Sequence, residues 1–175
     1  MSVLFYRLDR RPVLPDLSDV PGELRIWRPA REGPPPHGSR TLANWLWWLF
    51  VRIGLFSRPG FAELSIWKDR RRVHRMIVTP RWYRFPFMAQ DDLQIGDLWT
   101  DPDERGRGLA RAALGEVLRR FGGEAERFWY VVEASNAPSV RLAQSSGMRL
   151  AGIGRRTCPF GLRALGRFEI QIPQS

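Results

Sequence analysis

Apolar and polar positions along the chain predict a mixed α/β protein. Alternation predicts a strand at 23–27, an apolar run predicts one at 93–100, and an aromatic and β-branched run predicts one at 128–134. Helical periodicity predicts a helix from Leu109 to Phe121, directly after the strand at 93–100. The other expected elements are a first strand at 3–8, a hairpin of 61–67 and 73–78 with a charged turn at 68–72, a short helix at 140–146, and last strands at 148–156 and 165–172.

Three segments depart from this pattern. Prolines and glycines at 30–38 predict a surface loop or linker, and 79–90 is expected to be a loop with large side chains. From Thr41 to Phe56 apolar residues, three tryptophans among them, run almost continuously. This run is shorter than the roughly 20 residues of a membrane-spanning helix. Three interpretations stay open: a helix packed on the sheet and a substrate, a helix lying flat in a membrane interface, and a dimer contact.

Length and composition indicate one folded domain. The chain has 175 residues, and a hydrophobic content of 43% argues against disorder. We expect a single domain over 1–175, with an irregular N-terminal arm at 1–40 that contains the first strand and the proline-rich loop, and a core at 41–175. Cys158 is the only cysteine, which excludes an intrachain disulfide, and no signal peptide is visible. Both features fit a cytoplasmic protein.

The net charge is +10, and every basic residue except Lys68 is an arginine. A positive field raises the local concentration of ligands that carry phosphates. Nucleic acid also suits a pI of about 11.3, but the arginines are scattered and no recognition motif is visible, so this partner is not favoured. No metal site is predicted.

The stretch from Pro102 to Ala110 carries the clearest chemical signal. Gly106 and Gly108 lie between a strand and a helix, where successive backbone N–H groups are left unpaired at the positive end of the helix dipole. Arg105 and Arg107 add forked donors suited to phosphate oxygens. The stretch therefore predicts a cradle for a phosphate or diphosphate. The alternative is a basic helix start whose glycines serve only geometry.

A second group of residues changes the balance between these readings. Asn136, Ser139 and the pair Gly147-Met148 follow the strand at 128–134. With the first motif they resemble the GNAT superfamily of N-acetyltransferases. The family signature Gln/Arg-x-x-Gly-x-Gly/Ala is matched by Arg105, Gly108 and Ala110, and Met148 replaces a phenylalanine. The resemblance covers roughly residues 63 to 172.

The resemblance implies an α/β (α+β) fold. Its central sheet is mixed, mostly antiparallel, with six or seven strands, flanking helices and a V-shaped splay between two parallel strands. It implies an N-acetyltransferase that uses acetyl-CoA as co-substrate and moves the acetyl group to a primary amine by direct attack on the thioester. The pantetheine arm would insert between the strands ending at 98–100 and 132–134. Coenzyme contacts are expected from Leu98, Trp99, Thr100, Arg105, Gly106, Arg107, Gly108, Leu109, Ala110, Asn136 and Ser139.

Three residues are candidate bases for the amine proton. Asp97 lies on the central strand, where many members of the family place a base, and Glu133 is embedded in an apolar strand, where burial would raise its pKa. His74 is a base by its chemistry. A water chain is an alternative to all three, and Asn136 would equally suit a helix N-cap. Many relatives carry a tyrosine seven residues after the motif asparagine, which protonates the thiolate; here Ala143 stands there, so the usual acid is absent.

The acceptor is indicated only by aromatic and basic side chains in the loop at 79–90 and the tryptophans at 45–48. Trp82, Tyr83 and Phe85, beside Arg81 and Arg84, favour an amino sugar, free or nucleotide-linked, unless these aromatic residues are core. Two other functions stay open. One is a non-catalytic coenzyme-binding or regulatory module. The other is a membrane-peripheral or partner-binding protein, including a homodimer, acting through 41–56.

Overall fold

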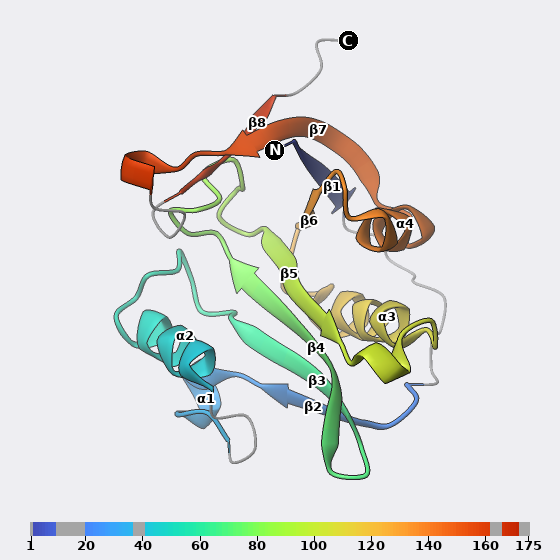
Figure 1. The fold of residues 1–175 in the computed structure, drawn as a ribbon. Coiled ribbons are helices and arrows are strands. Elements are labelled where there is room, and N and C mark those ends of the chain that lie inside the picture. Colours follow the sequence, from blue (N-terminus) through green and yellow to red (C-terminus); the bar gives the residue numbers. More distant parts are fainter. Residues whose placement is uncertain (1, 10–19, 37–40, 162–165, 172–175) are drawn as a thin grey trace.

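A computed structural model describes residues 2–9, 20–36, 41–161 and 166–171. Within them a single eight-stranded sheet has the order β2-β3-β4-β5-β6-β1-β7-β8, with helices on both faces (Figure 1). The strands are β1 (Val3–Asp9), β2 (Glu23–Trp27), β3 (Ala62–Lys68), β4 (Arg71–Pro80), β5 (Leu93–Thr100), β6 (Arg127–Glu133), β7 (Arg149–Arg156) and β8 (Phe168–Gln171). The helices are α1 (Pro29–Glu32), α2 (Leu42–Arg52), α3 (Leu109–Phe121) and α4 (Ala137–Ser145), with 3-10 turns at Pro102–Glu104 and Pro159–Gly161.

The parallel strands β5 and β6 separate along their length. They pair only through residues 93–95 of β5 and 128–130 of β6, the last pair being Ile95 and Tyr130. On its other edge β5 carries one more residue than β4 between the pairs Arg75–Trp99 and Ile77–Gly96, and Asp97 within this bulge has a φ of 49°. A bulge bends its strand. The bent β5 therefore leaves β6, and the expected V-shaped splay is present.

Strand β1 lies in the interior of the sheet. It runs antiparallel to both β6 and β7, and its Val3, Phe5, Tyr6 and Leu8 are buried. Because β1 and β2 both join the sheet, it has eight strands where six or seven were expected. The N-terminal segment supplies the two strands expected in it, at 3–8 and 23–27.

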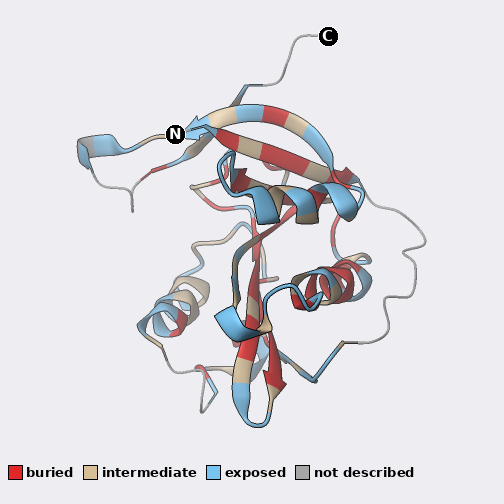
Figure 2. Ribbon diagram, turned by 45° about the vertical axis from the view of Figure 1, so that its right-hand side comes forward, coloured by how far each residue is buried: buried red, intermediate tan, exposed pale blue. Residues whose placement is uncertain are grey.

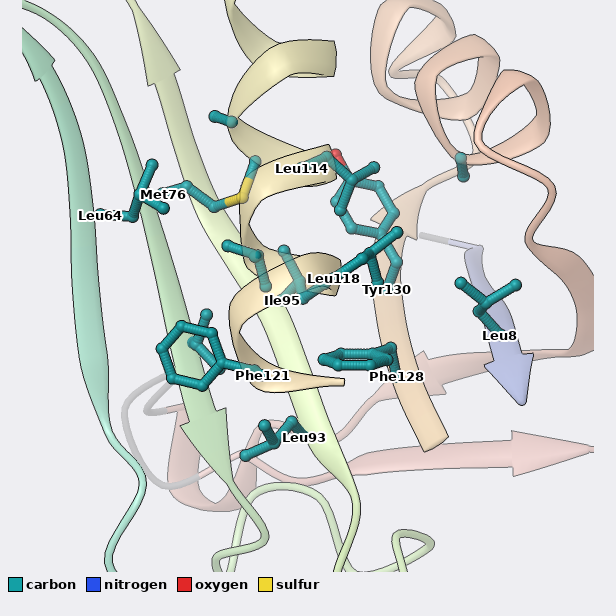
Figure 3. Close-up of a cluster of buried hydrophobic side chains, with 14 of the residues drawn as sticks. Leu8, Leu64, Met76, Leu93, Ile95, Leu114, Leu118, Phe121, Phe128 and Tyr130 are labelled. Carbon is teal, nitrogen blue, oxygen red and sulfur yellow. The ribbon is translucent and has the colours of Figure 1, made fainter. Parts of the chain in front are cut away.

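The two faces of the sheet carry different helices. Residues Leu114, Val117 and Phe121 of α3 pack in one cluster with Leu64 and Ile95 of the sheet, and Figure 3 shows much of this core. Ala143 of α4 belongs to the same cluster, so α3 and α4 share a face. On the opposite face α2 packs through Trp47 and Trp48 against Phe61 and Ile77. Figure 2 shows α3 largely buried and α2 largely exposed.

Some boundaries differ from the sequence expectations. Residues 30–32 belong to α1, which begins at Pro29; proline at the first helical position has no amide to satisfy and a preset φ. Helix α4 begins at Ala137 because the Asn136 side chain accepts a hydrogen bond from the Ser139 amide at 3.2 Å. The last strand is confined to Phe168–Gln171, while expected strand positions 165 and 172 lie outside the described residues.

Candidate functional site

The loop between β5 and α3 presents an unoccupied row of backbone donors. No acceptor within the described residues takes a hydrogen bond from the amides of residues 106 to 111. Gly106 and Gly108 have φ values of 76° and 77°, a region that favours glycine. A Cβ added at either glycine would meet no protein atom within 4 Å, so the space in front of them is open. This row of amides at the α3 N-terminus suits a phosphate or diphosphate.

The β3–β4 hairpin braces this loop. Lys68 Nζ lies 2.7 Å from Glu104 Oε2, and Arg107 reaches the same carboxylate at 3.4 Å. The hydrogen bond from Lys68 and the nearby positive charges lower the pKa of Glu104. Arg71 approaches Asp101 at 3.6 Å. Lys68 and Arg71 of the charged hairpin turn therefore tie it to the loop between β5 and α3.

The expected coenzyme contacts gather around the splay and the loop. Leu98, Trp99 and Thr100 lie on β5 beyond its last pair with β6. Arg105 and Arg107 are exposed on the loop, although Arg105 Nε also donates to the Thr100 carbonyl at 3.4 Å. Ser139 and Asn136 lie at the start of α4, which follows β6. The side-chain oxygen of Asn136 caps α4, which is the N-cap role that the sequence analysis gave as an alternative to a coenzyme contact.

A pocket of about 190 Å³ opens beside the splay on the α2 face. It is lined by Gly96 and Asp97 of β5, Val131 of β6, Trp47 of α2 and Phe168 of β8. Its remaining lining residues are Ile77, Thr79, Trp82, Arg84, Phe85 and Gln94. Four of its lining residues are thus aromatic, and Asp97 is the one acidic residue among them.

Two larger hollows adjoin this pocket. One of about 430 Å³ shares Val131 and Phe168 with it and extends past Glu133 to Arg155 and Cys158. The other, of about 400 Å³, shares Trp82 and lies on the outer side of the loop, where Arg81 and Arg167 are exposed. No described carboxylate pairs with either arginine. Aromatic and basic side chains of the 79–90 loop therefore line both sides of Trp82, although Trp82 and Phe85 themselves are buried.

The three candidate bases lie in different surroundings. Asp97 is half exposed in the pocket, with its Oδ2 2.9 Å from Arg75. Glu133 is exposed, so the burial that the sequence predicted for it is absent. His74 is fully buried, its Nδ1 is 2.8 Å from Thr100 Oγ1, and burial lowers its pKa to about 4. It pairs with Ile66 on the face of the sheet that α3 covers, and it lines none of the three described hollows.

Two residues that the sequence reading did not single out belong to this region. Glu63 is buried under α2, where Asn44 Nδ2 donates to it at 2.9 Å and Arg72 lies at 3.2 Å; burial raises its pKa. Tyr130 forms the last pair at the vertex of the splay, and burial raises the pKa of its hydroxyl, against an opposing effect of the nearby Ser139. A polar residue inside an apolar strand is the signal that marks Glu63. Tyr130 shows no such signal, because a strand tyrosine is ordinary.

Comparison with known families decides the classification. The sequence profile of the acetyltransferase (GNAT) family matches residues 25–148. The chain belongs to the GNAT family of acetyltransferases. Within that family the β5–β6 splay and the loop at 105–110 are the expected coenzyme site. No curated protein matches the chain in sequence.

Solved GNAT structures share the fold at low identity. A GCN5-related N-acetyltransferase from Sphaerobacter thermophilus superposes with a TM-score of 0.56 at 15% identity, over 87% of this chain and 49% of that one. A GNAT acetyltransferase from Colwellia psychrerythraea gives 0.55 at 14%, over 86% and 53%. An aminoglycoside N-acetyltransferase in complex with CoA gives 0.50 at 14%, over 73% and 91%. The chain thus spans about half the length of the first two.

Two absences hold for the described residues alone. No three His, Cys, Asp or Glu side chains gather there into a group that would hold a metal ion. None of the described helices is long and apolar enough to cross a membrane.

Proposed function

We propose that the protein is an acetyl-CoA-dependent N-acetyltransferase that acts on a primary amine of a small molecule. The observation that carries the proposal is the row of unpaired amides at 106–111, which lies where β5 has parted from β6. Acetyl-CoA carries a diphosphate for such a row and a pantetheine arm that pairs with open strand edges. When bound, it supplies the thioester from which the acetyl group passes to the amine.

The two proposed sites lie on opposite faces of the sheet. The loop between β5 and α3 lies with α3, α4 and Tyr130 on one face, and the pocket beside Asp97 lies on the other. An amine in the pocket therefore faces the splay from the side opposite the coenzyme loop. This placement favours direct attack, because the amine and the acetyl-CoA thioester approach the splay from opposite faces of the sheet and do not compete for the same space.

Asp97 is the residue we assign to the amine. Its carboxylate is in the pocket wall, where it binds the ammonium form and receives the proton that must leave before attack. Arg75 fixes the position of this carboxylate through the 2.9 Å ion pair. Glu133 lines the adjoining hollow, and His74 lies on the opposite face of the sheet, which α3 covers. Neither residue lines the proposed amine pocket, so Asp97 is the better candidate base.

Tyr130 takes the role of proton donor that Ala143 cannot fill. Its hydroxyl carries a proton at neutral pH, as a tyrosine ordinarily does, and Tyr130 lies at the vertex of the splay. Replacing Tyr130 with Phe should lower kcat by about tenfold or more while leaving the KM for acetyl-CoA unchanged, measured by thiol release. Ser139→Ala removes a polar side chain near Tyr130 but keeps the Tyr130 hydroxyl. An equal loss of kcat in both variants would assign Tyr130 to structure instead.

The acceptor class follows from the pocket. A single amine-bearing ring fits about 190 Å³ and stacks on Trp47, Trp82 or Phe168. An amino sugar meets this description, and a nucleotide-linked one would place its phosphates toward Arg81 and Arg167 in the adjoining hollow. Free thiol release from acetyl-CoA should therefore be faster with free or nucleotide-linked amino sugars than with linear alkyl amines. If no tested amine raised thiol release above the uncatalysed rate, a non-catalytic coenzyme-binding module would be favoured instead.

The coenzyme site has its own test. Gly108→Asp places an anion in the open space before the amides and requires a left-handed φ of a non-glycine residue, so CoA affinity should fall at least about tenfold in calorimetry. Gly123→Asp is the matched control, because it adds the same charge at a glycine outside the loop where a Cβ also meets no protein atom. Unchanged CoA affinity in Gly108→Asp would contradict the site.

A further inference from the structure

The outer face of α2 carries a continuous apolar stripe that nothing in the described chain covers. Leu42, Trp45, Leu46, Leu49 and Ile53, the last being the residue that ends the helix, are each 40% to 78% exposed. Their spacing places them on one face of a helix about 100° wide. None of the five packs against the three buried clusters, whereas Trp47, Trp48 and Val51 on the inner face do. Figure 2 shows this helix in alternating exposed and intermediate colours.

The inner face of α2 is held firmly. Thr41 Oγ1 accepts a hydrogen bond from the Asn44 amide at 3.2 Å, and Asn44 donates to buried Glu63. Trp47 contacts Phe61, Phe56 and Trp82 through its ring. The helix therefore cannot turn its apolar stripe inward without breaking these contacts, and the stripe is a fixed outer surface.

Charge around the stripe is positive. Arg52 flanks it on the helix and is exposed, with its guanidinium 5.8 Å from the Trp48 ring. Arg31 is exposed on α1, which packs beside α2, and no described carboxylate pairs with it. The sequence has no acidic residue between Thr41 and Ala62. On α1 and α2 together the one acid is Glu32, which accepts a hydrogen bond from the Arg28 amide.

We propose that the outer face of α2 docks on an anionic lipid bilayer, with the helix lying parallel to the surface. Leucine and isoleucine side chains would enter the boundary of the acyl chains, tryptophan suits the interfacial region, and arginine meets the lipid phosphates. A second copy of this chain fits less well, because each copy carries a net charge of +10 and the flanking arginines would face one another. The proposal does not depend on the acetyltransferase activity.

Vesicle cosedimentation tests it. The wild-type protein should sediment with vesicles of phosphatidylcholine mixed with phosphatidylserine or phosphatidylglycerol, and much less with phosphatidylcholine alone. Added salt should weaken the binding, because surface charges are screened. Absence of binding to either anionic mixture would overturn the proposal and assign the face to a protein partner. Equal binding with and without anionic lipid would also overturn it.

Variants distinguish binding through the apolar stripe from non-specific binding of the protein to vesicles. Leu46→Gln with Leu49→Gln should lower the partition coefficient at least tenfold, and Arg52→Gln should lower it several-fold on anionic vesicles only. Leu150→Gln is the matched control, since Leu150 is an exposed leucine of β7 and lies outside the stripe. Unchanged partition in the double variant would contradict the proposal. So would sedimentation equilibrium showing a wild-type dimer that the double variant dissociates.

Discussion

Asp97 combines an unusual backbone with a reactive side chain. Its left-handed φ belongs to the bulge that opens the splay, and its carboxylate belongs to the pocket beside it. The sequence marks Asp97 as a candidate through family position alone. Its conformation depends on the register between β4 and β5, which no local pattern reveals.

Replacing Asp97 with Asn should keep the fold, because asparagine adopts the left-handed region readily. The variant cannot accept the amine proton, so kcat/KM for the amine should fall about 100-fold or more while CoA affinity stays constant. Steady-state kinetics and calorimetry measure the two quantities. Arg75→Gln removes the ion pair but keeps the carboxylate; an equal kinetic loss in both variants would show that Asp97 acts only through its position.

His74 should influence stability instead of turnover. Its pKa is about 4 in the fold and about 6.5 in an unfolded chain, so the unfolded state binds more protons between these values. The stabilising contribution is complete above pH 6.5 and is lost as the pH falls toward 4, by about 3 kcal/mol in all. Urea unfolding of wild type and His74→Asn across this pH range isolates the contribution of His74 to the free energy of unfolding. A difference in the free energy of unfolding between the two proteins that did not change with pH would contradict this contribution.

At the scale of elements, α2 depends on a small buried polar group. Asn44→Ala leaves the Glu63 carboxylate without one donor, which should lower the free energy of unfolding by about 1–3 kcal/mol. Because α2 carries Trp47 of the pocket wall, the KM for the amine should rise while CoA affinity stays unchanged. Denaturant titration and kinetics check both. Adding Glu63→Gln should recover part of the stability, and a fully stable Asn44→Ala protein would contradict this role.

Elements with strong local signals were predicted closely. Strand β5 and helix α3 have the expected bounds, since an apolar run and a 3.6-residue period are each fixed by neighbouring residues. Helix α1 was missed, because the prolines and glycines at 33–38 led to a loop being predicted from residue 30, whereas Pro29 begins a short helix there. The early start of α4 reflects capping by Asn136, which the sequence reading kept as an alternative.

For the whole molecule, the position of β1 was beyond sequence reasoning. Val3–Asp9 reads as a strand, but its two neighbours β6 and β7 lie more than a hundred residues further along the chain. Such pairing is set by long-range packing, with Phe5 and Tyr6 buried on opposite faces. The coenzyme loop was predictable because its signal is local, whereas the amine pocket needs α2, β5, β6 and β8 brought together.

A crystal structure with CoA bound tests the central claim most directly. The account predicts the diphosphate within hydrogen-bond distance of amides among residues 106–111, and the pantetheine arm between β5 and β6 with its sulfur near Tyr130. A diphosphate bound elsewhere, or a splay closed by a continuous β5–β6 ladder in that complex, would contradict it.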